Sequence, residues 1–375
     1  MTPKRRTNRT RFTWLFALVA VIALFAAACS SSDDTTATDD TKDTTTTEAA
    51  AGDAPTDAEI TALTTSVSGG GASFPDAFYQ AVNTDFNGIA GSERVTYAKS
   101  GSSDGRAQLI AGTLDYAGSD SLPKPEEVFP GTLLYFPTVA APITVSYNLT
   151  GVDELDLSAD VIAGIFQAEI TTWDDAKIAA ENPDADLPST AITVVHRSDG
   201  SGTTNNFTKY LVAAAPDTWK LESGDEVNWP ATTQGAEKNS GVAEVIKQTD
   251  GAVGYVDLAD AGKAGLTFAR IKNSSGEYVA PSVEGVQAAL AGAEVAADLT
   301  YNPLNGTDPA AYPITAPTWL LVIAEQSDAG KAATIKTYLQ YVLTAGQEEA
   351  ASTGYVALPD ELAAKAIAQL NKIKG

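Results

Sequence analysis

Residues 194–207 read VVHRSDGSGTTNNF and join a strand pattern to a helix pattern through a loop of small residues. The apolar run before Arg197 predicts a buried strand, and the stretch that begins at Gly202 predicts a helix. The first N–H groups of a helix have no partner inside the helix, and the helix dipole makes that end positive. An arginine beside such a loop adds a fixed charge. The stretch therefore predicts an α/β fold with a place for an anion.

Similar units recur along the chain, because short apolar runs alternate with helical patterns. Strands are expected at residues 94–100, 113–119, 191–197, 252–258 and 317–324, and helices at 104–112, 202–215, 241–249 and 330–344. Strands that alternate with helices predict a parallel α/β architecture. In open sheets of this kind, ligands bind at the carboxyl ends of the strands.

Three loops carry small hydroxyl residues or glycine just before a predicted helix. The candidate ligand residues are Ser73 and Phe74 in the first loop, Ser102 in the second, and Ser201, Gly202 and Thr203 in the third. Pro75 is expected at the first helical position, which would put the first pair at a helix start. Any single loop of this composition can simply cap a helix or form a turn. Three of them after strands indicate a common site for a compact oxyanion.

Arg197 is the cation expected in that site. Its planar guanidinium can bind two oxygens of a tetrahedral anion at once, and Asp199, two residues later, can orient it. The alternative is a surface ion pair, which would contribute little to stability.

Asp120 ends the predicted strand 113–119 at the same edge of the sheet. A carboxylate repels an anion unless a proton lies between them. Hydrogen phosphate carries such a proton, and sulfate at neutral pH does not. Asp120 as a proton acceptor would admit phosphate and reject sulfate. A helix cap or turn residue is the alternative interpretation.

Several kinds of catalytic site are excluded by motif. The loop after Arg197 lacks the lysine of a nucleotide-binding P-loop, and it does not match the G-x-S-x-G nucleophile elbow. The only histidine, His196, neighbours Arg197 on the predicted strand and should face the other way. One histidine and one cysteine exclude a zinc site of the usual kind. We therefore expect no metal and no cofactor.

The N-terminus has the pattern of a secretory signal peptide, assigned to residues 1–28. Five basic residues precede an apolar run that ends in small residues, and the run is shorter than the ~20 residues of a spanning helix. Cys29, the only cysteine, follows directly and resembles the lipidated cysteine of bacterial lipoproteins, although Ala26 stands where leucine is usual. Residues 29–62 are expected to be this cysteine and a disordered acidic tether, with the folded part starting near Leu63.

Acidic residues dominate the composition. The chain has 48 acidic and 24 basic residues and a formal net charge of −24. Removing the signal peptide takes five basic and no acidic residues, which makes the mature net charge −29. This excess argues against nucleic acid and anionic lipid as partners.

Seven stretches occur in an order that resembles a known family. They are GGGASFP (69–75), SGSSDGRAQLIAGTLDYAGSD (100–120), FPTVAAPITVSYN (136–148), TTWDD (171–175), ITVVHRSDGSGTTNNFTKYL (192–211), NSGVAEVIKQTDGAVGYVDLA (239–259) and PIT with WLLV (313–322). Together they are similar to the extracytoplasmic phosphate-binding protein of the bacterial high-affinity phosphate ABC transporter. The likeness runs from about Val67 to about Pro359.

The resemblance implies a two-lobed periplasmic-binding-protein fold of type II, with the chain crossing between lobes near 138–142 and 312–315. One lobe would hold residues 63–140 and 313–375, and the other residues 141–312. The ligand would lie in the cleft between them, which closes by a hinge motion.

By position, the resemblance implies that Arg197 and each candidate loop residue contact phosphate, Phe74 through its backbone. It also implies that Asp120 accepts a proton from the ligand and that Asp199 is the partner of Arg197. The implied function is a receptor that delivers phosphate to membrane permease subunits, as a monomer anchored through Cys29. Two alternatives remain open. One is a secreted phosphatase or phosphoryl-transfer enzyme with Ser102 or Ser201 as nucleophile. The other is a surface adhesin or antigen with an incidental phosphate site.

Overall fold

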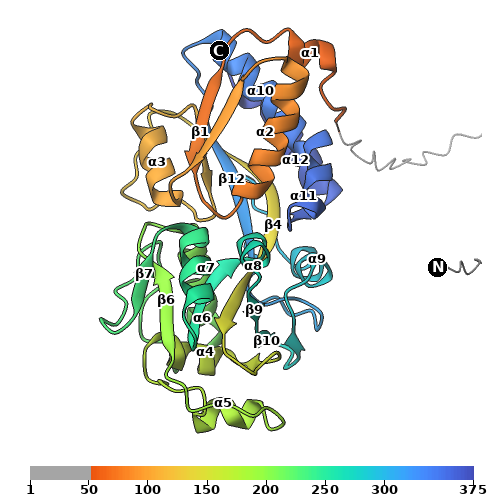
Figure 1. Ribbon diagram of the computed structural model, residues 1–375. Coiled ribbons are helices and arrows are strands. Elements are labelled where there is room, and N and C mark those ends of the chain that lie inside the picture. The colour runs from red at the N-terminus through yellow and green to blue at the C-terminus, as the bar shows by residue number, and fades with distance from the viewer. Residues whose placement is uncertain (1–51) are drawn as a thin grey trace, which may run out of the picture. The chain divides into compact units, whose positions relative to one another are not determined.

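One long strand, β4 (Leu133–Asn148), runs through both halves of the folded chain (Figure 1). Its first part pairs antiparallel with β12 (Thr315–Ile323), and its second part pairs antiparallel with β8 (Ala252–Asp257). The change of partner falls between Pro142 and Ile143. The main sheet is therefore continuous, in the order β2-β1-β3-β12-β4-β8-β6-β7.

The first half of this sheet belongs to what we name the terminal lobe, because it is built from the two ends of the folded chain. In Figure 1 its orange and blue segments lie together at the top. Its strands are β1 (Val67–Gly71), β2 (Val95–Lys99), β3 (Tyr116–Ser119), β12, the start of β4 and β13 (Val356–Ala357). Its helices are α1 (Asp57–Thr61), α2 (Asp76–Ala90), α3 (Ser102–Ile110), α10 (Ala329–Leu343), α11 (Glu349–Ser352) and α12 (Asp360–Gln369).

The second half of the sheet belongs to the central lobe, formed by the middle of the chain. Its strands are the end of β4, β6 (Thr193–Arg197), β7 (Gln234–Ala236), β8 and β9 (Thr267–Phe268), with a small sheet of β5 (Asp156–Leu157), β10 (Arg270–Lys272) and β11 (Tyr278–Val279). Its helices are α4 (Ala159–Phe166), α5 (Ala176–Glu181), α6 (Gly202–Ala214), α7 (Lys238–Gln248), α8 (Leu258–Ala264) and α9 (Val283–Ala291).

The computed structural model describes residues 52–375. The predicted signal peptide, Cys29 and most of the predicted tether lie outside these residues. None of the helices in the described part is long and apolar enough to cross a membrane.

The ordered chain begins before Leu63, which corrects the predicted end of the tether. Residues 57–61 form α1, which starts with a capping box between Thr56 and Glu59 and buries Ile60. The sequence Thr-Asp-Ala-Glu carried this capping signal, but the low complexity of the preceding segment obscured it.

Each strand and helix expected from the sequence is present, with ends shifted by a few residues. Two details differ from the expectation. Pro75 caps α2 from outside the helix and does not occupy its first position. The sheet is also mixed, because β12 and β4 run antiparallel to their neighbours, while β1, β2 and β3 are parallel to one another. The two-lobed α/β fold itself is as predicted, and the exact lobe boundaries remain a prediction.

Helix α3 packs directly against β1, and Gly105 makes the close approach possible. A Cβ atom on Gly105 would lie 2.5 Å from the Cα of Gly71 and 3.0 Å from the carbonyl oxygen of Gly70. Both obstacles are backbone, so neither can rotate away. The contact fixes the position of α3 and therefore of its first residue, Ser102.

We predict that Gly105→Ala destabilises the protein by about 1–3 kcal/mol, because the new methyl group forces α3 away from β1. The matched control is Gly88→Ala on the exposed face of α2, where a Cβ atom meets nothing within 4 Å. That change should raise stability by up to ~1 kcal/mol through helix propensity. Urea unfolding monitored by circular dichroism measures the stability of both variants. Equal stabilities of the two variants would contradict the packing argument.

Candidate functional site

The loops after β1, β2, β3 and β6 meet between the two lobes, at the carboxyl ends of these strands. All eight predicted ligand residues lie there, and all eight are buried. Strands β1, β2 and β3 contribute from the terminal lobe, and β6 contributes from the central lobe. The sheet order thus brings together residues that lie far apart in the sequence.

Direct hydrogen bonds join the lobes at this place. The backbone N–H of Gly202 donates to Ser102 Oγ (3.1 Å), and Asn206 Nδ2 donates to the carbonyl oxygen of Asp120 (2.6 Å). The backbone N–H of Asn239 donates to Ser73 Oγ (3.3 Å). The lobes are therefore closed on one another around the site.

Four backbone N–H groups in the site are free of any protein partner. Among residues 52–375, no group accepts a hydrogen bond from the backbone N–H of Ser73, Phe74, Ser102 or Thr203. Unpaired donors are costly when buried, and buried N–H groups of native proteins are nearly always paired. An acceptor from outside the chain would pair them, and donors at helix starts favour an anion.

The guanidinium of Arg197 is held from two sides. Asp199 accepts from Nε (2.7 Å) and from Nη2, and Asn239 Oδ1 accepts from Nη1 (2.7 Å). One N–H group on Nη1 and one on Nη2 have no acceptor among the described residues. Those two donors suit two oxygens of one anion. Burial alone would raise the pKa of Asp199, but hydrogen bonds and charge from Arg197 hold it below its ordinary value.

Asn239 is a central residue that the sequence analysis missed. Besides Arg197, its side chain contacts Thr203 Oγ1 (3.1 Å) and Asp257 Oδ2 (2.7 Å) through Nδ2. Burial and the neighbouring Asp260 raise the pKa of Asp257. Asn239 stands near the start of α7, where asparagine is an ordinary capping residue. Nothing in the local pattern distinguished it from a cap.

Asp120 lies at the end of β3 and is 2 % exposed. Thr318 Oγ1, on β12, donates to its Oδ1 (2.7 Å), and Ser102 Oγ lies 3.5 Å from its Oδ2. Burial raises the pKa of Asp120 to about 7, against the opposing effects of the Thr318 hydrogen bond and the Arg197 charge. Near neutral pH this carboxyl group can therefore take up or release a proton. Thr318 was also missed, because its strand is almost 200 residues away in sequence.

Ser201, another predicted ligand residue, has a local role that leaves its hydroxyl hydrogen available as a donor. Ser201 Oγ caps α6 by accepting from the backbone N–H of Thr204 (3.1 Å).

His196 stacks on the ring of Trp229, with the ring centroids 5.0 Å apart, so it packs away from the ligand residues as expected. Its neighbour Arg197 is the residue that points into the site.

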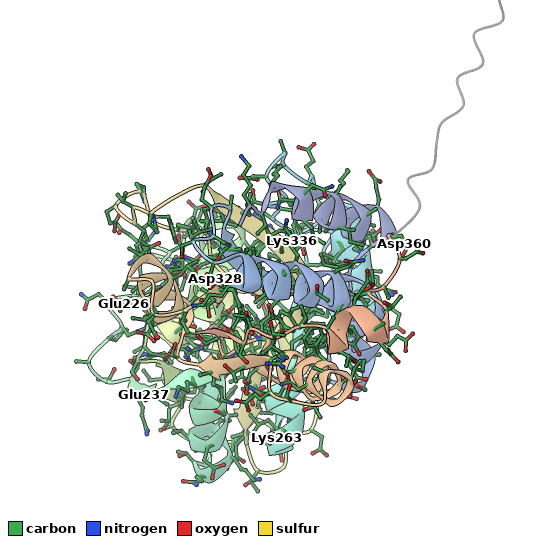
Figure 2. All side chains as sticks on the ribbon, turned by 90° about the horizontal axis from the view of Figure 1, so that it is seen from above. Glu226, Glu237, Lys263, Asp328, Lys336 and Asp360 are labelled. Atoms are coloured by element: carbon green, nitrogen blue, oxygen red, sulfur yellow. The ribbon has the colours of Figure 1, made fainter. Side chains whose placement is uncertain are left out.

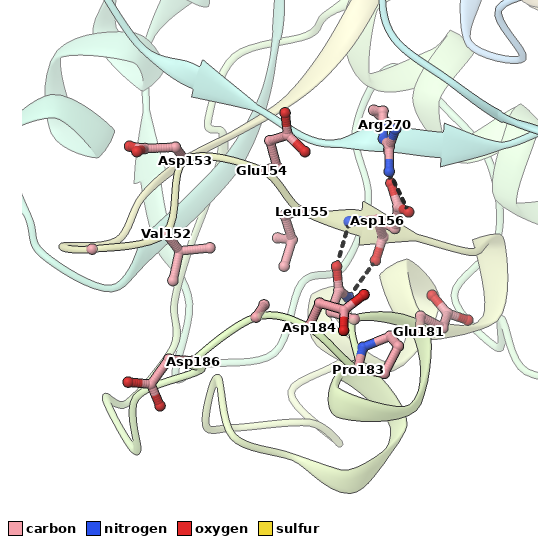
Figure 3. A pocket seen from close by; sticks show the side chains of 13 residues that line it. Val152, Asp153, Glu154, Leu155, Asp156, Glu181, Pro183, Asp184, Asp186 and Arg270 are labelled. Atoms are coloured by element: carbon pink, nitrogen blue, oxygen red, sulfur yellow. Dashed lines mark hydrogen bonds and ion pairs between the residues drawn. The ribbon is translucent and has the colours of Figure 1, made fainter.

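A separate cavity of about 360 Å³ lies in the central lobe, and none of the predicted ligand residues lines it. Six acidic residues surround it, with Arg270 already paired to Asp156, as Figure 3 shows. The acidic residues are Asp153, Glu154, Asp156, Glu181, Asp184 and Asp186. This cavity repels anions, so it is not a second anion site.

Comparison with known proteins places these observations in a family. A family model for a PBP superfamily domain matches residues 35–345. The chain is 34 % identical to the phosphate-binding protein PstS of Xylella fastidiosa (strain 9a5c), covering 82 % of this chain and 85 % of that protein. It is 36 % identical to the phosphate-binding protein PstS of Pasteurella multocida, covering 82 % of this chain and 91 % of the relative.

Solved structures are similar in fold. A high affinity periplasmic phosphate-binding protein (PfluDING) bound with phosphate has a TM-score of 0.68 at 24 % sequence identity, covering 81 % of this chain and 93 % of that one. A phosphate-binding protein from Stenotrophomonas maltophilia has a TM-score of 0.63 at 21 % identity, covering 81 % and 94 %.

The raised pKa of Asp120 predicts a specific pH dependence of stability in the ligand-free protein. The folded state keeps a proton up to about pH 7, while the unfolded chain loses it near the ordinary value of 3.8. The stabilising contribution of the protonated group is therefore lost as pH rises through this window. Relative to Asp120→Asn, the wild type should lose about 2–4 kcal/mol of unfolding free energy between pH 4 and 7.

Urea unfolding of the wild type and Asp120→Asn across this range measures the difference. Asp184→Asn, at an exposed carboxyl group, is the control and should run parallel to the wild type. A constant offset between the wild type and Asp120→Asn at every pH would contradict the prediction.

Proposed function

Since the chain belongs to the family of phosphate-binding proteins within the PBP superfamily, we propose that it binds inorganic phosphate between its lobes and delivers it to an ABC importer. The free backbone N–H groups of Ser73, Phe74, Ser102 and Thr203 are the observation that supports this most directly. They surround a place that also receives Arg197, and they need acceptors that the described residues do not supply.

In the proposed site, phosphate oxygens accept from these N–H groups, from the free donors of Arg197, and from the hydroxyl groups of Ser102, Ser201 and Thr203. Gly202 allows the start of α6 to approach the terminal lobe closely. Its missing side chain matters, because a Cβ atom there would lie 2.7 Å from the Cβ of Asp120. Asp199 and Asn239 orient the guanidinium and do not touch the ligand.

Asp120 would select for a protonated anion. A carboxylate accepts a hydrogen bond from the O–H of hydrogen phosphate, whereas sulfate would face it with an unprotonated oxygen. Two acceptors without a proton between them are strongly unfavourable in a buried site. The hydrogen bond from Thr318 leaves the other oxygen, Oδ2, for this contact.

Attraction of the ligand must come from local groups. The net charge of −24 repels anions at long range. Helix starts and Arg197 act only within about a Debye length, roughly 8 Å at physiological salt. This favours a receptor that captures its ligand by closing around it over one that steers it from a distance.

The finer features of the proposal concern the setting of the receptor. We propose an extracytoplasmic monomer, anchored to the cell membrane by lipid on Cys29 and docked to permease subunits of the importer. The terminal lobe, from α1 to residue 140 together with residues 313–375, would move as one body, and residues 141–312 as the other. The change of partner along β4 supports a hinge close to the first predicted crossing.

Calorimetry of the full-length protein with phosphate, sulfate and a phosphate monoester tests the function and its specificity. The wild type should bind phosphate and reject sulfate. Asp120→Asn should bind phosphate about tenfold more weakly and should now bind sulfate, because an amide can donate to an unprotonated oxygen. Continued rejection of sulfate by this variant would refute the selective role of Asp120. Hydrolysis of the monoester that is lost in Ser201→Ala would favour the phosphatase alternative.

Arg197→Ala should raise the phosphate dissociation constant at least 100-fold, because it removes the cation that faces the ligand and leaves the half-buried Asp199 carboxylate without its counter-charge. Arg270→Ala is the matched control, since it removes a central-lobe arginine whose partner is Asp156, away from the site. It should bind phosphate like the wild type. An unaltered dissociation constant in Arg197→Ala would remove this residue from the site.

A further inference from the structure

A buried ion pair joins the two lobes beside the ligand residues. Arg106 Nη2, on α3 of the terminal lobe, lies 2.6 Å from Asp225 Oδ2 of the central lobe. The side chains are 0 % and 1 % exposed. Such complete burial of a charge pair between two moving bodies calls for an explanation, because each charge loses its hydration when the lobes meet.

Every N–H donor of Arg106 has an acceptor in the closed arrangement. Within its own lobe, Nε donates to Glu127 (2.8 Å), and Nη1 donates to the hydroxyl groups of Ser119 and Ser121 (2.9 Å each). Nη2 donates to Asp225 and weakly to Ser103 Oγ (3.4 Å). Arg106 therefore has no donor left for an anionic ligand, which excludes it as a direct ligand residue.

Asp225 depends on the other lobe for its partners. Its Oδ2 accepts from Arg106 and from Ser103 Oγ (2.8 Å), both in the terminal lobe. Its Oδ1 is buried and has no hydrogen-bond partner among the described residues. Separation of the lobes would return this carboxylate to water, whereas Arg106 would keep Glu127 and the two serines.

The pair is connected to the ligand loops on both sides. Arg106 stands one helical turn after Ser102 on α3. The carbonyl oxygen of Asp225 accepts from the backbone N–H of Ser201 (2.9 Å), and the N–H of Ser103 donates to the carbonyl oxygen of Gly200 (3.3 Å). Movement of either charged residue would shift a ligand loop.

Helix α3, which carries Arg106, is set apart from the crossing strand β4. In Figure 1, α3 lies at the left edge of the terminal lobe, whereas β4 lies near its centre. In the view from above, Glu226, the neighbour of Asp225, lies at the rim of the molecule (Figure 2). A contact set apart from a hinge has a longer lever arm than a contact beside it.

We propose that Arg106 and Asp225 are positioning residues that latch the cleft: they meet only when the lobes close and so slow the release of the bound anion. This inference rests on the proposed function. Its physical basis is that closure buries Asp225 at a tolerable cost only when Arg106 is in place. Without Arg106, the closed state would contain an unpaired buried carboxylate.

A double-mutant cycle in the full-length protein tests the latch. The variants are Arg106→Gln, Asp225→Asn and the double variant, with Asp156→Asn as a control that breaks an ion pair inside one lobe. The measurements are the phosphate dissociation rate by stopped flow and the melting temperature without phosphate.

Arg106→Gln should release phosphate on the order of 100-fold faster, because it strands the Asp225 carboxylate. Asp225→Asn should release it several-fold faster and keep the ligand-free melting temperature, since its carboxylate is hydrated in the open form. The double variant should be no faster than Asp225→Asn, because no buried charge is left unpaired. The Asp156→Asn control should match the wild type.

Additive effects in the cycle would overturn the latch, since they would mean that the two residues act independently. If Arg106→Gln fails to fold, Asp225→Asn decides alone, and a wild-type release rate in it overturns the proposal. A wild type that does not bind phosphate would instead refute the proposed function, and this outcome is distinct because it precedes any comparison of variants.

Discussion

The unpaired backbone N–H groups at the helix starts are the constraint on which the site depends. They arise because a helix cannot satisfy its own first donors. Each must be brought to the same place by a strand that ends there, and this is what the parallel order of β1, β2 and β3, with β6 in the other lobe, achieves. Gly105 lets α3 approach β1 closely enough to hold Ser102 in that position. The donors cannot reorient, so an anion that fits them is selected by shape as well as by charge.

Two opposite charges complete the site, and each is controlled by its surroundings. Arg197 is fixed by Asp199 and Asn239, which leaves only the donors that face the ligand. Asp120 is buried and hydrogen-bonded by Thr318, and burial brings its pKa to about 7. In the proposed function, its ionised form accepts a hydrogen bond only from an anion that carries a proton. A chain of high negative charge can thus hold an anion, because the local field of a few fixed groups outweighs the screened field of the distant surface.

Closure of the lobes turns this arrangement into a receptor. Strand β4 belongs to both lobes and changes its partner between Pro142 and Ile143, which is where we propose the hinge. Contacts such as Gly202 to Ser102 and Asn206 to Asp120 form only when the lobes are together. The Arg106–Asp225 pair lies among these contacts and is the most completely buried of their charges. Ligand affinity then depends on the equilibrium between open and closed lobes, because the ligand binds the closed form better.

The sequence by itself determined the local parts of this protein. The strand–loop–helix units, the donors at their helix starts and the neighbouring pair of Arg197 and Asp199 follow from residues a few positions apart, whose backbone geometry is set by local sterics and capping. The family resemblance added the two-lobed arrangement. Only the tertiary structure decided which distant side chains support the site. Asn239, Thr318 and the Arg106–Asp225 pair have ordinary local patterns, and they gain their roles because sheet order and lobe closure bring them beside residues that lie from about 40 to almost 200 positions away. Such contacts depend on how the whole chain packs, and no short pattern encodes them.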